Sequence, residues 1–567
     1  MFEQAPWSRR RSRWWFGLSS LVLAIVLLAG CSGGQTNTQQ TPTTNQFVTL
    51  PLGIPTAALN APITGPVPDN QILHVNVTFA LDENALKQFN QGGHLVKPDQ
   101  STNGADIAKQ LGISDADYKK IKDFFGVNDA SLTLSQTHTS LNVDIKAGEA
   151  AKILQTKFVY HSLNGRTYYT PDPSHLPQVP QAIAGKILAV TGLDTYSQAP
   201  KTGFHQSGQS FKPAGAKNFG LCPLNVPGFA GRDQVARSYG FDKLWQRGWM
   251  GQKYTVDLVE IDGVSQSDLQ PYFDCVGYKG KVSFTTVDSG VPAPQGETTL
   301  DIDMIAGLAS DVNIHDYQTD ISKAADGGWQ YLLDTFQRII DDHAHNLYSQ
   351  DVVSVSLGAP EAGLTSSLAA AFSQRLHILT DVEHMTVFVA SGDCAAYMDG
   401  VYGQLDVSFP ASDPYAVAVG GTTLKTDLSG QQRSSEIAWS NGSDKQQCNN
   451  SWGTGGGLST FFAKPDWQTG VSGIQNKYSN GKRQLPDIAA AADNLLVFFQ
   501  GIWQPIGGTS AATPIWATAM IILNQGYIAT KDFFSYAPDT FYFIQSNAAQ
   551  ARPFYQITQG DNLYYKA

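Results

Sequence analysis

Charged residues are scarce in this sequence, and their scarcity narrows the classes of protein to which it can belong. Asp, Glu, Lys and Arg make up 15% of the 567 residues, against about 25% in an average soluble protein. The 49 acidic residues outnumber the 38 basic ones, and the net charge of −11 argues against a nucleic-acid-binding protein. A surface sparse in charge is compatible with acid. The chain is 42% hydrophobic and too long for one core, so two or three domains are expected.

Several motifs of common enzyme classes are missing. No C-x-x-C pair occurs, so zinc ribbons and thioredoxin-type redox sites have no support. The H-E-x-x-H metal motif and a P-loop lysine are also absent. None of the histidines in the second half of the chain stands in the His-Gly-Thr setting of a subtilisin; they are His315, His343, His345, His377 and His384. His343 and His345 lie in a polar stretch and are expected to be solvent-exposed.

The N-terminus has the features of an export signal. Four arginines between Arg9 and Arg13 precede an uncharged stretch, Trp14–Ala29, which is shorter than the ~20 residues of a membrane span. The stretch ends in Leu-Ala-Gly-Cys31, which resembles a bacterial lipobox. We expect residues 1–30 to be removed and Cys31 to carry lipid, placing the protein on the outer face of the cytoplasmic membrane or outside the cell. An ordinary signal peptide with an incidental cysteine is the alternative. Residues 31–70 are assigned to a flexible tether.

Export makes disulfides possible for the remaining four cysteines. Three connectivities exist for them. The sequence-local one, Cys222–Cys275 with Cys394–Cys448, is preferred.

Two folded blocks follow the tether. The first, residues 71–195, alternates short strands with helices and predicts a small α+β sandwich, with Ile183–Thr191 as its last helix. A polar segment rich in Gly, Pro and Ser, 196–222, predicts a linker or processing segment. The second block, 223–567, contains continuous apolar runs that predict buried parallel strands in an α/β fold. These runs are Tyr254–Ile261, Val282–Val287, Val352–Ser356, Met385–Ala390 and Ala416–Val419.

A serine stands at the start of a predicted helix in the segment Gly507–Pro514. At this position Ser510 would have free backbone N–H groups and a favourable helix dipole, which suit a nucleophile whose reaction builds an oxyanion. The alternative is that Ser510 only caps the helix. Since no histidine is well placed, a carboxylate is the next choice of base.

Three carboxylates occur in suggestive settings. Glu297 and Asp301 are four residues apart on a predicted helix, so they share one face and are expected to titrate as a pair. They could equally be ordinary acidic residues at a helix start. Asp393 follows a predicted strand in the segment Ser-Gly-Asp. The strand that ends in Ser356, Leu357 and Gly358 could pair with an extended peptide.

In this order, the segments resemble the sedolisin family of serine-carboxyl peptidases, in particular its kumamolisin-like members. The resemblance rests on Gly508–Pro514, on Glu297 with Asp301, and on Ser391–Asp393. Further matches are Phe409–Ser412, Val419–Thr423, Gly455–Ser459 and Pro486-Asp487. It implies a subtilisin-like parallel sheet flanked by helices, preceded by a ferredoxin-like α+β pro-domain.

The resemblance also implies roles for these residues. Ser510 would be the nucleophile of a serine-type endopeptidase, Glu297 its general base, and Asp301 the residue that orients Glu297. Asp393, protonated in acid, would stabilise the oxyanion. Ser356, Leu357, Gly358, Gly456 and Gly457 would bind peptide or protein substrate. The pro-domain would inhibit and chaperone its own catalytic domain in a self-processed, monomeric zymogen.

Two departures from the family pattern concern the carboxylate network and calcium. Glu260 matches a network glutamate, but Leu357 stands where kumamolisin-like members have tryptophan. Gln556 and Ile557 match the start of the family's C-terminal calcium site, with Gln556 in place of Asp, so we expect weak calcium binding or none. Two rival interpretations remain: a catalytically impaired homologue, and a substrate-binding lipoprotein of a transporter.

Overall fold

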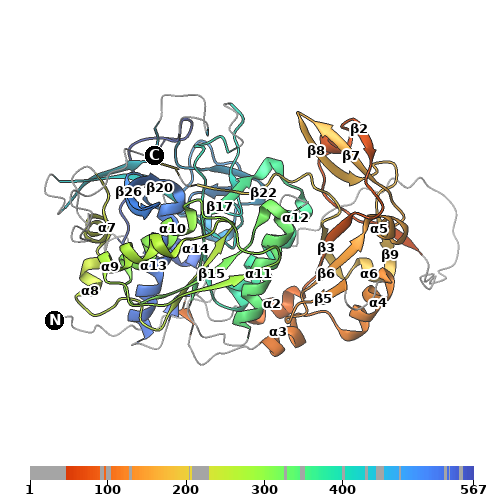
Figure 1. Cartoon of the computed structure of the whole chain (residues 1–567), viewed down its shortest axis with the longest axis horizontal. Coiled ribbons are helices and arrows are strands. Elements are labelled where there is room, and N and C mark those ends of the chain that lie inside the picture. The colour runs from red at the N-terminus through yellow and green to blue at the C-terminus, as the bar shows by residue number, and fades with distance from the viewer. Residues whose placement is uncertain are drawn as a thin grey trace. The chain divides into compact units, whose positions relative to one another are not determined.

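The computed structural model describes most of the chain from residue 46 onward. The described residues are 46–89, 95–96, 104–126, 131–203, 205–206, 229–324, 328–344, 351–398, 403–427, 432–441, 448, 452–471, 474–528, 533–534, 537–547 and 553–566. Most elements from β1 to β10 form an N-terminal domain, and those from α7 onward form a C-terminal domain, with which β4 pairs through β27 (Figure 1). The expected signal peptide, Cys31 and the first part of the tether lie outside the described residues.

The N-terminal domain is built on a four-stranded antiparallel sheet in the order β10-β3-β6-β5. Alternate residues of β3, Leu73, Val75 and Val77, are buried in a core that includes residues of two helices. The strands are β3 (Ile72–Phe79), β5 (Leu132–Leu134), β6 (Ser140–Lys146) and β10 (Ile187–Thr191), and the helices α4 (Asp115–Phe125) and α5 (Ala147–Ile153). The remaining elements are β1 (Phe47–Thr49), α1 (Thr56–Leu59), β2 (Ile63–Pro66), α2 (Glu83–Phe89), β4 (Leu95–Val96), α3 (Gly104–Gln110), β7 (Phe158–Leu163), β8 (Arg166–Pro171), β9 (Gln178–Pro180) and α6 (Gln181–Ala184).

Two predictions for this domain are wrong. The stretch predicted as a helix, Ile183–Thr191, is mostly strand β10, which pairs antiparallel with β3 because its β-branched residues suit the edge of that sheet. The predicted tether ends too late. Residues 47–66 belong to the domain, since Leu50 and Leu52 are buried in its core and β2 pairs with β7.

The C-terminal domain contains an eight-stranded sheet in which only β21 runs antiparallel. The order is β14-β15-β13-β16-β18-β20-β21, and β24 also pairs with β20. The strands are β13 (Thr255–Glu260), β14 (Val282–Thr286), β15 (Asn313–Gln318), β16 (Val352–Val355), β18 (Thr386–Ala390), β20 (Val417–Thr426), β21 (Arg433–Ala438) and β24 (Ile488–Ala491). All five strands predicted for this domain are confirmed. The sequence pattern did not predict β15 as a strand, because the polar residues His315, Asp316 and Gln318 interrupt its apolar pattern.

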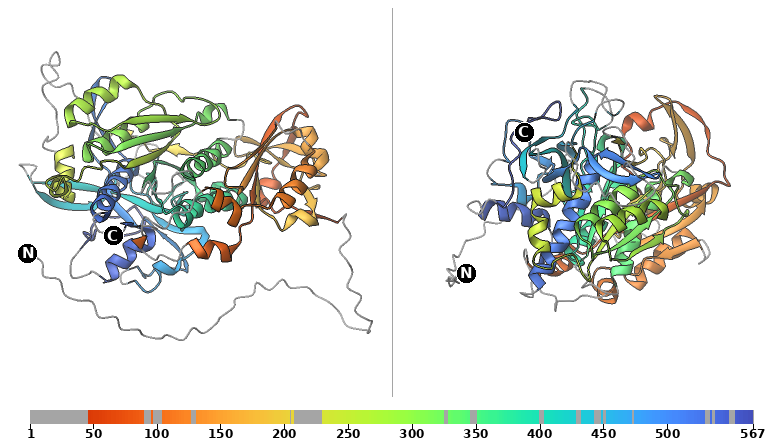
Figure 2. Two further views of the ribbon diagram at one scale, coloured as in Figure 1. Left: turned by 90° about the horizontal axis from the view of Figure 1, so that it is seen from below. Right: turned by 60° about the vertical axis from the view of Figure 1, so that its left-hand side comes forward.

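Helices cover both faces of this sheet (Figure 2). Val256 and Leu258 of β13 belong to one core cluster with residues of α10 (Glu297–Leu308) and α13 (Thr509–Ile528), whereas Val259 belongs to a second cluster with residues of α11 (Trp329–His343) and α12 (Ser366–His377). Because side chains alternate along a strand, Glu260 lies on the α10 face and Asp257 on the α11 face.

The other elements of the C-terminal domain are shorter or peripheral. They are α7 (Arg232–Tyr239), α8 (Phe241–Trp245), α9 (Gln266–Val276), β17 (Leu357–Pro360), β19 (Ser408–Phe409), β22 (Gly457–Ala463), β23 (Lys482–Leu485), β25 (Leu495–Phe499), β26 (Ile502–Gly507), β27 (Phe533–Phe534) and α14 (Ala537–Asn547), with 3-10 turns at Ile321–Lys323, Glu361–Gly363 and Asp466–Gln468 and a π turn at Ile378–Val382. A linker between the domains contributes β11 (Lys201–Thr202) and β12 (His205–Gln206).

The N-terminal sheet is hydrogen-bonded to α11. Ser140 Oγ donates to Gln337 Oε1 at 3.0 Å, Thr191 Oγ1 donates to Gln330 Oε1 at 2.8 Å, and Asn142 Nδ2 donates to Asp334 Oδ1 at 2.6 Å. The two domains therefore meet along the helical layer that covers the opposite face of the sheet from α10 and α13.

One predicted disulfide is confirmed, and the predicted pairing of Cys275 with Cys222 stays a prediction. Cys394 is bonded to Cys448. Cys275 is also disulfide-bonded, whereas Cys222 lies outside the described residues. Within the part of the chain that the structure describes, no helix combines the length and the apolar composition needed to span a membrane.

Candidate active site

Ser510 lies in the first turn of α13, as predicted. It is 1% exposed, and the long apolar helix behind it is buried in the core. Gly508 precedes it with φ of 147°, and a Cβ at this position would clash with the carbonyl oxygen of Gly203. Only glycine therefore lets another stretch of backbone pass so close to the serine.

Glu297 and Asp301 occupy the first turns of α10, and both are completely buried. Ser356 Oγ donates to Asp301 Oδ2 at 2.6 Å, and Ser510 Oγ lies 3.4 Å from the carbonyl oxygen of Ser356. The Ser510 hydroxyl is close enough to Glu297 to lower the pKa of this carboxyl, although neither Glu297 oxygen has a hydrogen bond of good geometry within the described residues. The structure thus brings the predicted nucleophile, the predicted base and the predicted orienting carboxyl together.

The carboxyl groups of this site hold their protons to higher pH than isolated ones. Burial, and then the charge of Asp301, raise the pKa of Glu297 well above its usual range. Burial also raises the pKa of Asp301 to about 7, against hydrogen bonds with Ser356 and Glu260 that lower it. The pair therefore loses its protons in two steps, and its singly ionised form is the one that can accept a proton from Ser510.

Two further carboxyls extend this pair away from the serine. Glu260, at the end of β13, interacts with Asp301, and burial followed by the Asp301 charge raises its pKa well above the usual range. Asp316 of β15 is fully buried, and burial followed by the Asp301 charge raises its pKa in the same way. Leu357 is a buried apolar residue. Asp316 thus interacts electrostatically with Asp301 and Glu260, and the sequence pattern missed it because it lies in an unpredicted strand.

Asp262 fixes the start of α10. Its Oδ2 accepts a hydrogen bond from the backbone N–H of Glu297 at 2.7 Å, and its Oδ1 accepts from that of Gln295. A carboxylate here satisfies N–H groups that the first turn of a helix leaves free, and it fixes the backbone that carries Glu297. Sequence reasoning missed Asp262 because it is 35 residues from Glu297 in the chain.

Asp393 follows β18 and lies beside the start of α13, as predicted. Its Oδ1 accepts from the backbone N–H of Thr509 at 2.7 Å and from the Thr509 hydroxyl at 2.8 Å. Its Oδ2 is directed to the other side, where a Cβ on Gly203 would clash with it and would lie 2.7 Å from Ser510 Oγ. Asp393 and Ser510 therefore face the same point in space.

The linker occupies that point. β11 pairs antiparallel with β17, with Lys201 opposite Gly358 and Thr202 opposite Leu357, and β12 pairs with β26. The strand edge predicted to bind an extended peptide is thus already paired with a segment of the chain itself. Gly203 lies between the two short strands and packs against Ser510 and Asp393.

A histidine from the linker contacts the site as well. His205 Nε2 is 3.0 Å from Asp393 Oδ2, and the imidazole stacks on Trp452 with ring centroids 3.6 Å apart. This histidine lies outside the second block in which a base was sought. Because His205 belongs to the linker, it contacts Asp393 only while the linker lies over the site.

The remaining predicted site residues have different surroundings. Ser356 supports Asp301, whereas Leu357 and Gly358 pair with the linker. Gly456 accepts a hydrogen bond from Asn562, and Gly457 pairs with Leu485 of β23. The prediction that His343 is solvent-exposed is wrong. Its side chain is 11% exposed and is paired with Asp257. His345 lies outside the described residues.

The residues at the expected calcium site do not fit that ion. Gln556 is exposed, and Asp561 is the one carboxylate side chain among residues 553–566. Asp561 Oδ1 already accepts from the backbone N–H of Leu563 at 3.0 Å. Calcium takes about six to eight oxygen ligands, which this segment does not gather within the described residues.

Comparisons with known proteins agree with this geometry. Residues 62–196 match the model of the pro-kumamolisin activation domain, and residues 289–536 match the model of the subtilase family. Sedolisin of Pseudomonas sp. (strain 101) is 28% identical over 88% of this chain and 84% of its own length. Kumamolisin of Bacillus sp. (strain MN-32) is 28% identical over 74% of this chain and 73% of its own length.

A solved structure supports the same assignment. Pseudomonas sedolisin, described as a serine-carboxyl proteinase in complex with two molecules of pseudo-iodotyrostatin, has a TM-score of 0.50 and 29% identity. The match covers 59% of this chain and 89% of that one. The fold and the site define a serine-type peptidase with a subtilisin-like catalytic domain and an activation pro-domain. The chain combines a pro-kumamolisin activation domain with a subtilase-family domain, and it is similar to sedolisin and kumamolisin.

Proposed function

We propose that this peptidase is an exported, acid-acting enzyme that uses Ser510, Glu297 and Asp301 as its catalytic triad and is made as a self-processing zymogen. The observation that carries the proposal is the position of the linker. An extended segment pairs with the β17 edge and passes Gly203 directly over Ser510 and Asp393, which is how a peptide substrate would have to lie.

The geometry supports the following reaction. Ser510 Oγ attacks the peptide carbonyl carbon while its proton passes to the singly ionised Glu297–Asp301 pair. The oxyanion receives hydrogen bonds from the Ser510 backbone N–H and from protonated Asp393, whose Oδ2 faces the reacting position while Oδ1 is held by Thr509. The Glu297 carboxyl then protonates the leaving amine, the C–N bond breaks, and water releases the acyl group by the reverse transfers.

A carboxyl base suits acid better than a histidine does. An imidazole with a reference pKa of about 6.5 is already protonated near pH 4, whereas a glutamate carboxyl with a reference pKa of about 4.3 is partly ionised there. Burial raises the pKa values of Glu297 and Asp301 while the linker covers the site, and release of the linker should lower them by admitting water. No part of this reaction depends on the C-terminal segment around Gln556, and we propose that the activity does not require calcium at that site.

Self-processing near Gly203 is the first expected outcome. When the precursor is shifted to about pH 4, wild type should release its pro-domain with a new N-terminus within a few residues of Gly203. Ser510→Ala should not, because it lacks the nucleophile. Gly203→Val should slow release, since its Cβ would clash with Asp393. Gly185→Val is a matched control in the pro-domain, where a Cβ would have no neighbour within 4 Å.

Mass spectrometry and N-terminal sequencing over time measure these rates. Equal release of the same fragment by wild type and Ser510→Ala, without added protease, would refute self-processing. Equal rates for Gly203→Val and Gly185→Val would refute the placement of the cut near Gly203.

Anchoring through Cys31 is the second expected outcome. Lipid on this residue would hold the enzyme at the outer face of the membrane, with the residues that follow as a tether. Cys31→Ala should move the protein from the membrane fraction to the medium or leave it unprocessed. Immunoblots of cell fractions measure this, and unchanged membrane association would argue for another anchor.

A further inference from the structure

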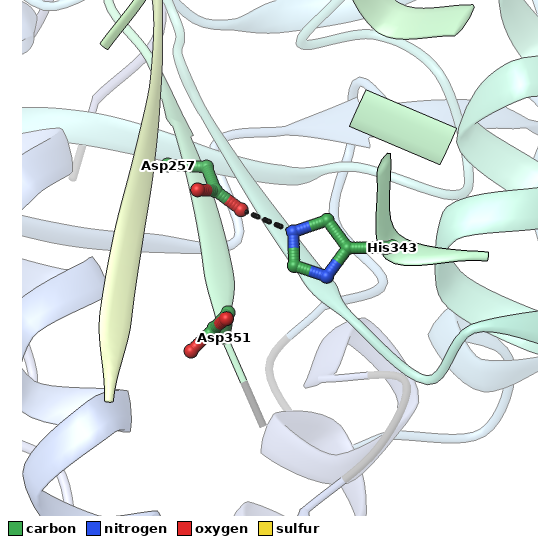
Figure 3. Close-up of side chains that lie close together, drawn as sticks. All are labelled: Asp257, His343 and Asp351. Atoms are coloured by element: carbon green, nitrogen blue, oxygen red, sulfur yellow. Dashed lines mark hydrogen bonds and ion pairs between the residues drawn. The ribbon is translucent and has the colours of Figure 1, made fainter. Parts of the chain in front are cut away.

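A second cluster of ionisable side chains lies on the opposite face of the sheet from the catalytic carboxyls. Asp257 comes from β13, His343 is the last residue of α11, and Asp351 immediately precedes β16. His343 Nε2 is 2.7 Å from Asp257 Oδ2, and one potential ligand atom of each residue lies within 4.8 Å of the other two. Figure 3 shows the three side chains together.

The cluster is buried. Asp257 is 1% exposed, Asp351 is 6% exposed, and the His343 side chain is 11% exposed. Asp351 is held in place by the backbone N–H of Thr255, which donates to its Oδ1 at 2.7 Å. Two buried carboxyls beside one imidazole concentrate negative charge at a place where a cation would be attracted.

A fourth group lies nearby. Glu383, at the end of the π turn Ile378–Val382, is 3% exposed and interacts electrostatically with His343 and Asp257. Neither of its carboxyl oxygens has a hydrogen-bond partner within the described residues. A deeply buried carboxyl with both oxygens free is unusual, because such groups are normally satisfied. The carboxyl oxygens of Glu383 are therefore available to a ligand bound beside His343 and Asp257.

We propose that Asp257, His343 and Asp351 form a binding site for a first-row divalent metal ion, for which Zn²⁺ fits best, and that Glu383 supplies a fourth ligand. Zinc binds imidazole nitrogen and carboxylate oxygen at about 2.0–2.2 Å, so its ligand atoms lie roughly 3.3 Å apart in a tetrahedron. The three ligand atoms lie within 4.8 Å of one another, so the most distant pair would approach by up to roughly 1.5 Å on binding. A mixed nitrogen and oxygen set this small suits zinc better than calcium, which requires more oxygens.

The site would act on structure and not on the reacting atoms. The ion would tie the end of α11 and the start of β16 to β13, the strand whose far end carries Glu260. Asp257 and Glu260 lie on opposite faces of this strand, so the metal would not contact the catalytic carboxyls. Its effect should be seen in stability before it is seen in the rate.

Calorimetric titration of the full chain carrying Ser510→Ala tests the proposal. After treatment with a chelator near neutral pH, ZnCl₂ should bind saturably at this site and raise the melting temperature by roughly 3 °C when zinc exceeds its dissociation constant 100-fold. Asp351→Asn and Asp257→Asn should each weaken this binding by at least about 10–100-fold. Zinc-edge X-ray absorption should show one nitrogen and two or three oxygen ligands near 2.0 Å.

The chain offers a matched control. His377 and Asp381 form a similar pair, with Nε2 and Oδ2 2.9 Å apart, and neither belongs to the three-residue cluster. His377→Gln should leave zinc binding unchanged. Asp351→Asn keeps the shape and the bond from Thr255, so it decides the matter if Asp257→Asn fails to fold. Absence of saturable zinc binding, or equal binding by Asp351→Asn and the unsubstituted chain, would overturn the proposal.

Discussion

Replacing Ser510 by alanine should lower kcat by about 10⁶-fold, and replacing Glu297 by alanine should lower it by a similar factor. In the proposed mechanism, alanine at position 510 removes the atom that forms the acyl-enzyme. Alanine at position 297 removes the group proposed to take its proton. Because the two residues act as one unit, the double variant should be no slower than the slower single variant.

Hydrolysis of an internally quenched peptide in acid measures these rates. Ser546→Ala is a matched control, since Ser546 lies in α14 and donates its hydroxyl to the carbonyl oxygen of Tyr542 within the same helix. It should retain the wild-type rate. Losses of Ser510 and Glu297 that add up independently would contradict a shared proton-transfer step. Full activity of Ser510→Ala would exclude Ser510 as the nucleophile.

Replacing Asp393 should have the second largest effect. Asp393→Ala removes one of two oxyanion donors and should lower kcat by about 10²–10³-fold, with less change in KM. Asp393→Asn keeps an N–H donor that does not titrate. This variant should lose activity through altered geometry, but its remaining activity should extend to higher pH than that of wild type.

The melting temperature of each Asp393 variant provides the control, because Oδ1 also receives two hydrogen bonds from Thr509. A loss of rate with an unchanged melting temperature assigns the effect to the oxyanion. Activity of Asp393→Ala within a few-fold of wild type would exclude Asp393 as a donor.

Short motifs made the core of the site predictable from the sequence. Ser510, Glu297 and Asp393 each stand at the start of a helix or the end of a strand, where local sequence fixes both the backbone and the free N–H groups. The five buried strands were predictable because they are continuous apolar runs. In each case the signal lies within about ten residues of the feature that it predicts.

Features that depend on distant contacts were not predictable. β15 is a strand because its neighbours β13 and β14 pair with it. Its polar residues give it no apolar run by which a strand could be predicted. Asp262, Asp316 and His205 join the site only after folding, since each is far in sequence from the residue it serves. The pattern at Ile183–Thr191 was compatible with a helix, and the free edge of β3 determines that it forms a strand.

The rival interpretations make different predictions. A substrate-binding lipoprotein has no need for Ser510, Glu297 and Asp393 around one point, or for a linker threaded past them. A catalytically impaired homologue would keep this geometry but would not react with a fluorophosphonate. The convergence of Ser510, Glu297 and Asp393 favours an active enzyme. The pH dependence of the reaction distinguishes this interpretation from an impaired homologue.

The dependence of kcat/KM on pH, measured from about pH 2 to about pH 8 for wild type and Glu297→Ala, tests the central claim most directly. Burial raises the pKa values of the Glu297–Asp301 pair while the linker covers the site. Release of the linker admits water, so the pair of the processed enzyme should reach its singly ionised form, which acts as base, at lower pH. Asp393 must still carry its proton. The account therefore predicts a bell-shaped profile with its maximum below about pH 6 for wild type, and almost no activity for Glu297→Ala. A wild-type maximum between about pH 7 and 8, or near-full activity of Glu297→Ala, would contradict the serine-carboxyl mechanism and point to a different base.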